Sequence, residues 1–212
     1  MAERSYRGLL WGLALLAAFA DQGTKYGIFA SLYNHGEGDS RPLIPGAFDL
    51  LVQFTGERET GSGVLPKLRT VFGDALPRVN SGALFGMRLT QILGLRDDGG
   101  RLDNQVFAAI SLLAAGAILF WSTRPSLGRD RLLCTALGLI LGGTLGNLYD
   151  RIVFNGVRDF LHWHYAFEWP VFNLADCCLV SGAILLLAQA VWARPAHASD
   201  QPIPAQEAVP AP

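Results

Sequence analysis

The stretch GGTLGNLYDR, residues 142–151, ends an apolar run with an amide, a carboxylate and a guanidinium group. A second stretch, FNLAD at residues 172–176, opens the next apolar run with Asp176. A charged side chain at bilayer depth costs about 2.5–3.5 kcal/mol on insertion scales, so it persists where it is paired, faces a cavity or takes part in chemistry. The two stretches therefore predict a membrane protein whose polar groups gather at helix ends.

The composition agrees with a membrane protein. The chain has 212 residues, of which 50% are hydrophobic and 17% charged, whereas soluble domains carry about 25% charged residues. The net charge of −1 provides no field to attract nucleic acid, so we expect no nucleic-acid partner. Cys134, Cys177 and Cys178 lack zinc-site spacing. We expect no disulfide and no structural metal.

Four segments approach the length of about 20 apolar residues that a transmembrane helix needs. They cover residues 8–30, 106–121, 132–149 and 174–192. The first also resembles a cleavable signal peptide, but apolar residues resume after Lys25, and Asp21 lies at i,i+4 to Lys25 and can pair with it. The predicted fold is therefore an all-α polytopic membrane protein, a single domain of four transmembrane helices over residues 1–194.

Lysine and arginine accumulate on the cytoplasmic side of membrane proteins, and three basic flanks orient this chain. They are Arg4 and Arg7, then Arg124, Arg129 and Arg131, then Arg194. Both termini are thereby predicted to be cytoplasmic, and residues 31–105 and 150–172 to face outward. Residues 195–212 are rich in proline and alanine and are predicted to form a disordered cytoplasmic tail.

The outer segment 31–105 is long enough to need structure of its own. Residues 47–54 and 68–72 are predicted strands, and residues 55–64 a loop. In the third predicted helix, Gly138, Gly142 and Gly146 recur every four residues, a spacing that lets helix backbones approach closely.

The carboxylates allow more than one assignment. Asp176, with Asn173 three residues earlier, fits a helix cap as well as a reactive group. Asp159 lies 17 residues before Asp176, a separation that a short loop can close. Asp150 is the competing partner, although Asn147 and Arg151 beside it favour a buried polar brace.

Two aspartates close together cannot both ionise, so they share a proton and can hydrolyse a peptide bond. His162 and His164 form only an H-x-H pair in an aromatic-rich loop, which favours a position at the membrane–water interface over metal binding.

Five motifs in order give the chain a family resemblance. They are DQGTK at 21–25, NSGALFG at 80–86, GGTLGNLYDR at 142–151, VRDF at 157–160 and FNLAD at 172–176. With them the chain resembles the bacterial lipoprotein signal peptidases, also called signal peptidase II. The resemblance implies that Asp159 and Asp176 are the catalytic pair. It also implies residues that bind substrate or support the dyad: Asp21, Lys25, Asn80, Gly82, Asn147, Asp150, Arg151, Asn173 and Ala175.

The same resemblance implies a diacylglyceryl-modified prolipoprotein as substrate, cut just before its lipidated cysteine, and it implies no cofactor or metal. It further implies a monomer among membrane lipids in the bacterial inner membrane, with a small extracytoplasmic β-sheet cradle and the dyad near the outer face.

This chain departs from the family pattern in three places: an insertion at 55–78, which we expect to be a mobile flap, a longer approach at 89–104, and Leu84 in place of a small residue. The alternative function is a small transporter or proton-conducting helical bundle that uses the same carboxylates. A noncatalytic membrane scaffold is a third possibility.

Overall fold

The computed structural model describes residues 5–82, 89–94 and 99–192. Within these residues the helices are α1 (Arg7–Ser31), α2 (Val64–Arg69), α3 (Leu89–Ile92), α4 (Arg101–Ser122), α5 (Arg131–Phe154) and α6 (Leu174–Trp192). The strands are β1 (Gly38–Ile44), β2 (Phe48–Arg58), β3 (Ala75–Pro77) and β4 (Leu161–Trp163). The predicted tail at 195–212 and Leu84 lie outside the described residues.

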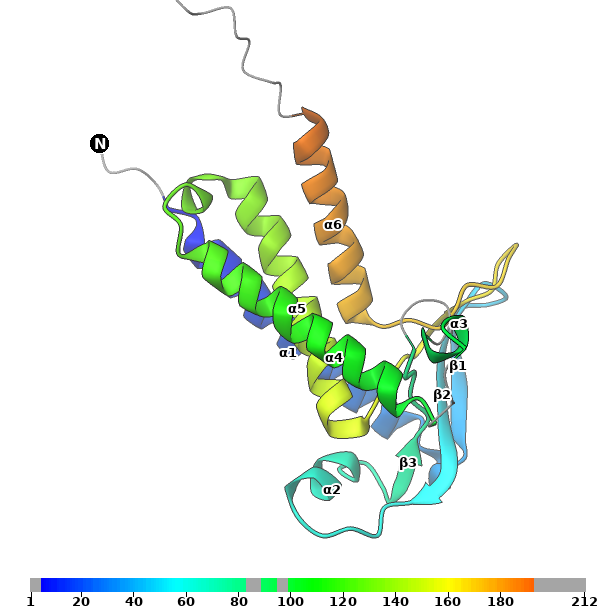
Figure 1. Ribbon diagram of the computed structural model, residues 1–212. Coiled ribbons are helices and arrows are strands. Elements are labelled where there is room, and N and C mark those ends of the chain that lie inside the picture. Colours follow the sequence, from blue (N-terminus) through cyan, green and yellow to red (C-terminus); the bar gives the residue numbers. More distant parts are fainter. Residues whose placement is uncertain (1–4, 83–88, 95–98, 193–212) are drawn as a thin grey trace, which may run out of the picture.

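The four long helices, α1, α4, α5 and α6, occupy the four segments predicted from the apolar runs (Figure 1). By length and composition, α4, α5 and residues 174–191 of α6 could each cross a membrane. Helix α1 is as long but carries Arg7, Asp21 and Lys25. The structure therefore identifies three candidate spans, one fewer than the sequence predicted.

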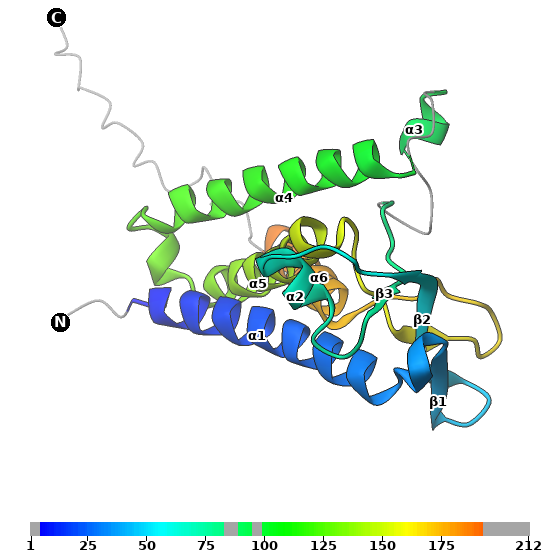
Figure 2. The ribbon, with the colours of Figure 1, turned by 90° about the horizontal axis from the view of Figure 1, so that it is seen from below.

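Helix α5 is the centre of the bundle, because it packs against α1, α4 and α6 (Figure 2). The predicted glycine stripe explains its close approach to α1. A Cβ on Gly138 would lie 2.7 Å from the Leu10 carbonyl oxygen, and one on Gly142 would lie 2.5 Å from Ala17 Cβ. A neighbouring glycine, Gly143, brings α6 equally close. Tight packing at these glycines is confirmed.

A four-stranded antiparallel sheet lies at the end of the bundle where α1 ends and α6 begins (Figure 1). Strand β2 is its centre, since β1, β3 and β4 all pair with it. Val52 of β2 and Phe160 pack with Phe29 of α1 and with Leu32 just after it, so the sheet is fixed to the bundle. The small sheet that the resemblance implied is present.

The strand predicted at 47–54 is confirmed, but two neighbouring predictions are wrong. Strand β2 continues to Arg58, into the predicted loop. The strand predicted at 68–72 is instead the last turn of α2 followed by a turn. Phe72 there packs against Tyr26, Phe29, Tyr33 and Phe54. Its apolar character serves an aromatic cluster rather than a strand face.

The insertion at 55–78 is folded against the bundle. It contains the second half of β2, helix α2 and strand β3. Arg69 of α2 donates to the Val153 carbonyl at the end of α5, and Tyr26 donates a 3.1 Å hydrogen bond to the Leu68 carbonyl. The role of the insertion as a flap over a substrate stays a prediction.

Candidate active site

Asp159 lies in the segment between α5 and β4, and a backbone bridge places Asn80 beside it. The Asn80 N–H donates to the Val157 carbonyl at 2.8 Å, and the Val157 N–H donates back at 2.9 Å. Asn80 Nδ2 then donates a 3.2 Å hydrogen bond to Asp159 Oδ2. The two predicted residues, 79 positions apart in the chain, are thus brought together.

Asp176 stands in the first turn of α6 and exchanges hydrogen bonds with Asn173. The Asp176 N–H donates to Asn173 Oδ1 at 3.0 Å, and the Asn173 N–H donates to Asp176 Oδ2 at 3.1 Å. This reciprocal pattern is that of a capping box, which fixes both side chains. Asn147 of α5 donates to the other oxygen, Oδ1, at 2.8 Å.

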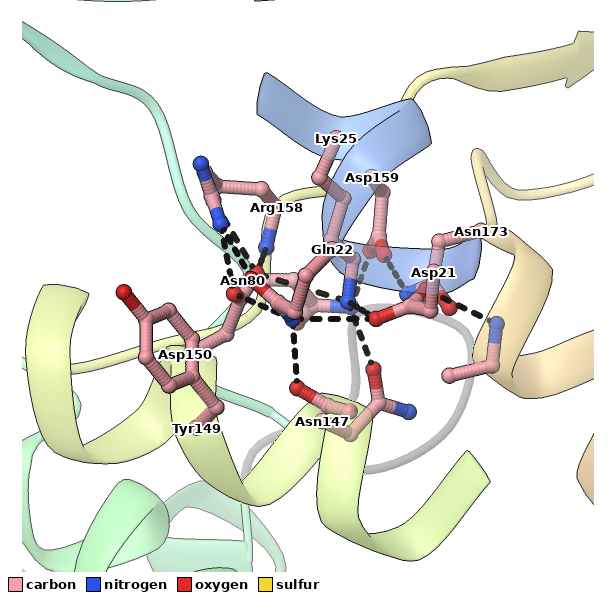
Figure 3. Close-up of polar contacts among 12 residues, drawn as sticks. Asp21, Gln22, Lys25, Asn80, Asn147, Tyr149, Asp150, Arg158, Asp159 and Asn173 are labelled. Atoms are coloured by element: carbon pink, nitrogen blue, oxygen red, sulfur yellow. Dashed lines mark hydrogen bonds and ion pairs between the residues drawn. The ribbon is translucent and has the colours of Figure 1, made fainter. Parts of the chain in front are cut away.

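Asn173 also joins the two carboxylates. Its side-chain Nδ2 donates a 2.7 Å hydrogen bond to Asp159 Oδ1 (Figure 3). Its backbone N–H donates to Asp176 Oδ2. Burial and the nearby Asp176 together raise the pKa of Asp159 to about 7, although the hydrogen bonds from Asn173 and Asn80 act to lower it. A carboxyl group with this pKa can carry a proton at neutral pH.

A buried ionic network on α1 and α5 supports these groups. Lys25 Nζ lies 2.8 Å from Asp21 Oδ2, as the i,i+4 spacing predicted, and 3.4 Å from Asp150 Oδ2. It also donates a 3.0 Å hydrogen bond to Asn147 Oδ1, which turns the Asn147 amide nitrogen toward Asp176.

The other oxygen of Asp21, Oδ1, accepts a 2.9 Å hydrogen bond from the Ala175 N–H. The carboxylate of α1 therefore caps the start of α6.

Asp150 pairs with Arg158 as well as with Lys25. Arg158 Nη2 lies 2.8 Å from Asp150 Oδ1, and its backbone N–H donates to Oδ2 at 2.9 Å. Its guanidinium carbon also lies 3.9 Å from the Phe154 ring centroid. The network thus contains two cations, Lys25 and Arg158, and two anions, all with 0% exposure. This balance lets the charges remain buried.

Gln22 is a further member that sequence reasoning missed. Its Nε2 donates to the Gly146 carbonyl at 2.9 Å, and its Oε1 accepts from Arg158 Nη2 at 2.9 Å. Both missed residues lie inside the quoted motifs, Gln22 in DQGTK and Arg158 in VRDF, which was the available signal.

Arg151 connects the segment at residue 82 to α4. Its Nη2 lies 3.4 Å from the Gly82 carbonyl oxygen and its Nη1 lies 3.3 Å from Asn104 Oδ1. The Gly82 N–H in turn donates to Asn80 Oδ1 at 3.0 Å, which orients the Asn80 amide nitrogen toward Asp159.

A cavity of about 370 Å³ opens beside Asp159. Strand β2, residues 78–82 and the segment before α6 form its walls, with the lining residues Leu51, Gln53, Arg78, Val79, Asn80, Ser81, Gly82, Asp159, Pro170 and Val171. Across the described ranges, no cluster of three or more His, Cys, Asp or Glu side chains could hold a metal ion. The arrangement suits acid–base chemistry on a bound polar group.

Comparison with known proteins gives a consistent family match. A family model described as "Signal peptidase (SPase) II" matches residues 13–192. A lipoprotein signal peptidase of Nitratidesulfovibrio vulgaris is 35% identical over 87% of this chain and 90% of its own length. One from Cupriavidus taiwanensis is 33% identical over 88% and 85% of the two chains. A match to the Rhodopirellula baltica enzyme, at 43% identity, covers 52% of this chain and half of that protein.

The fold also has a solved counterpart. A structure described as a bacterial membrane enzyme, solved at 2.3 Å resolution, superposes with a TM-score of 0.63. It covers 90% of this chain and 92% of its own length at 23% sequence identity. This likeness shows that the architecture is shared.

Proposed function

Because the chain belongs to the signal peptidase II family, a family of aspartic peptidases, we propose that it removes the signal peptide from diacylglyceryl-modified prolipoproteins. The bond cut is the one before the lipidated cysteine. The catalytic groups are Asp159 and Asp176. The observation that carries the assignment is the double contact of Asn173, which hydrogen-bonds to both carboxylates.

The two aspartates divide the acid and base roles. Asp159, whose pKa is raised to about 7 by burial and by the neighbouring Asp176, is the proton donor. Asp176 accepts hydrogen bonds from Asn147 and from the Asn173 backbone N–H, and it is the general base. A protonated buried acid beside a second carboxylate is the arrangement that a general acid–base pair needs.

The reaction then proceeds without a covalent enzyme intermediate. Asp176 takes a proton from a water molecule as the water oxygen bonds to the scissile carbonyl carbon, and Asp159 donates its proton to the carbonyl oxygen. When the tetrahedral intermediate collapses, the C–N bond breaks and the proton held by Asp176 passes to the leaving nitrogen. The proton that Asp159 gave to the carbonyl oxygen returns to it.

The substrate binds in the 370 Å³ cavity, whose lining includes Asp159, Gly82 and Val171. We propose that α1 is a fourth transmembrane helix, because the charges of Asp21 and Lys25 are paired and buried rather than exposed to lipid. Both termini would then be cytoplasmic, in the bacterial inner membrane, with the dyad near its outer face. The enzyme acts as a monomer among membrane lipids.

The decisive experiment measures cleavage of a diacylated prolipoprotein by the purified protein in lipid. Asp159→Asn and Asp176→Asn should each abolish cleavage while the protein still folds. Asp74→Asn is the matched control, because that carboxylate lies on the same outer region, is 53% exposed and pairs only with Arg58 and Tyr33 among the described residues.

Retained cleavage by either dyad variant would overturn the assignment of the pair. Absence of cleavage by the folded native chain would instead favour the transporter or scaffold hypotheses.

A further inference from the structure

A second cavity, of about 530 Å³, lies on the far side of the segment that borders the first. Val79 lines both cavities, so residues 77–80 separate them. The walls of the second cavity include Glu57 and Arg69 of the folded insertion, Arg101 at the start of α4, and Ile152 and Phe154 at the end of α5. Neither Asp159 nor Asp176 is among them, so this cavity is outside the proposed catalytic site.

Two arginines on different elements face this space. Arg69 is held in place before any ligand arrives, because it donates to the Val153 carbonyl and pairs with Glu59 at 3.0 Å. Arg101, the first residue of α4, is exposed, and the structure records no ion pair for it among the described residues. Among the lining residues, Arg69 and Arg101 face one carboxylate, Glu57, while Glu59, which pairs with Arg69, lies outside the lining.

The apolar part of the lining suits a lipid rather than a free ion. Ile152 is 58% exposed although it lies on α5, a helix apolar enough to cross a membrane. Arg101 begins one candidate span and Phe154 ends another, so the cavity lies at one membrane interface. Basic pockets between helices bind acidic lipid headgroups on the cytoplasmic side of membranes, and the same pairing of charges applies at this outer interface.

We propose that this cavity binds the phosphate of an anionic phospholipid, with Arg69 and Arg101 on the headgroup and an acyl chain along Ile152. Guanidinium groups match phosphate geometry through paired N–H donors. The carbonyl at the end of α5, which would repel an anion, is already occupied by Arg69. The insertion thereby builds a lipid site beside the wall of the first cavity.

The test measures phospholipid retained by the full-length protein, by native mass spectrometry, from mixtures of phosphatidylglycerol and phosphatidylcholine. The native protein should retain phosphatidylglycerol preferentially. Arg101→Gln should weaken that retention about fivefold, which corresponds to the ~1 kcal/mol that one basic residue contributes near a lipid surface. Arg41→Gln, an exposed arginine of β1 that lines neither cavity, is the matched control and should leave retention unchanged.

Three results would overturn the proposal. Equal losses in Arg101→Gln and Arg41→Gln would indicate general surface attraction. Equal retention of phosphatidylglycerol and phosphatidylcholine would show that charge has no role in binding. Complete displacement of the bound lipid by millimolar inorganic phosphate would show that the cavity binds free phosphate. Asp159→Asn should bind the lipid normally, so the lipid site and the peptidase function are tested separately.

Discussion

Asn173 donates a 2.7 Å hydrogen bond from its side-chain amide to Asp159 Oδ1. The side-chain oxygen of the same residue accepts a hydrogen bond from the Asp176 N–H. One amide therefore fixes both aspartates relative to α6. An asparagine can do this because it offers a donor and an acceptor on the same short side chain.

We expect Asn173→Ala to lower kcat/KM about tenfold, because it removes the two side-chain hydrogen bonds that orient Asp159 and the start of α6, each worth about 0.5–1.5 kcal/mol. The measurement is the rate of prolipoprotein cleavage in lipid. Gln105→Ala, which removes an exposed amide on α4, is the control and should cleave at the native rate. Equal rates for all three proteins would show that Asn173 only caps the helix.

The pH dependence of cleavage should report the protonation of Asp159. As the general acid, it must be protonated, so kcat/KM of the free enzyme should fall as the pH rises through about 7, the value set by burial and by Asp176. Asn80 donates to the ionised form and lowers this pKa. The variant Asn80→Ala should therefore shift the alkaline limb to higher pH, and an unmoved limb would contradict the assignment.

The same raised pKa predicts a pH-dependent stability. A carboxyl whose pKa is higher in the folded state favours folding while both states are protonated, and this contribution is lost as the pH rises through the folded-state pKa. We expect the melting temperature of Asp159→Asn, relative to the native protein, to rise between pH 4 and pH 8. A pH-independent difference would argue against a neutral buried Asp159.

Two glycines allow a matched test of helix packing. In Gly146→Ala the new Cβ would lie 2.6 Å from Asp21 Oδ2, so the substitution should cost about 1–3 kcal/mol of stability and displace the Asp21 contact with Ala175. Gly116 of α4 has nothing within 4 Å of such an atom. Gly116→Ala should stabilise α4 by up to about 1 kcal/mol. Thermal unfolding and cleavage of the two variants check this contrast.

A second matched pair compares a buried and an exposed ion pair. Arg158→Gln leaves Asp150 without its main partner at 0% exposure and should cost about 3–5 kcal/mol. Arg58→Gln breaks a pair with Asp74 in which both side chains are more than half exposed, so it should cost about 0–1 kcal/mol. Similar losses in chemical unfolding of the two variants would contradict this account of the buried network.

The long helices could be predicted from the sequence because each is a continuous apolar run with a local signal. Helix α5 ends at Phe154, five residues later than predicted. The helix can continue past Asp150 because the charge of that residue is neutralised by Arg158. Arg158 lies beyond a chain reversal at Asn155, which adopts the left-handed backbone conformation with φ 59°. No periodicity signals such a reversal, so the sequence could not single out Arg158 as the partner of Asp150.

Strand β4 was not predicted for a similar reason. It has three residues, and only its pairing with Phe48, Asp49 and Leu50 of β2 defines it. Among the site residues, the contact of Asn80 with Asp159 follows from a single backbone bridge to Val157. The motif resemblance could indicate that these residues act together, but not how they touch.

The hydrogen bond from the Ala175 N–H to Asp21 joins the first long helix to the last one. During synthesis, α1 leaves the ribosome long before α6, and until α6 arrives Asp21 has no amide to cap and Asp159 has no Asn173. The nascent chain is therefore expected to be inert as a protease throughout translation, and activity begins only when its final helix is inserted.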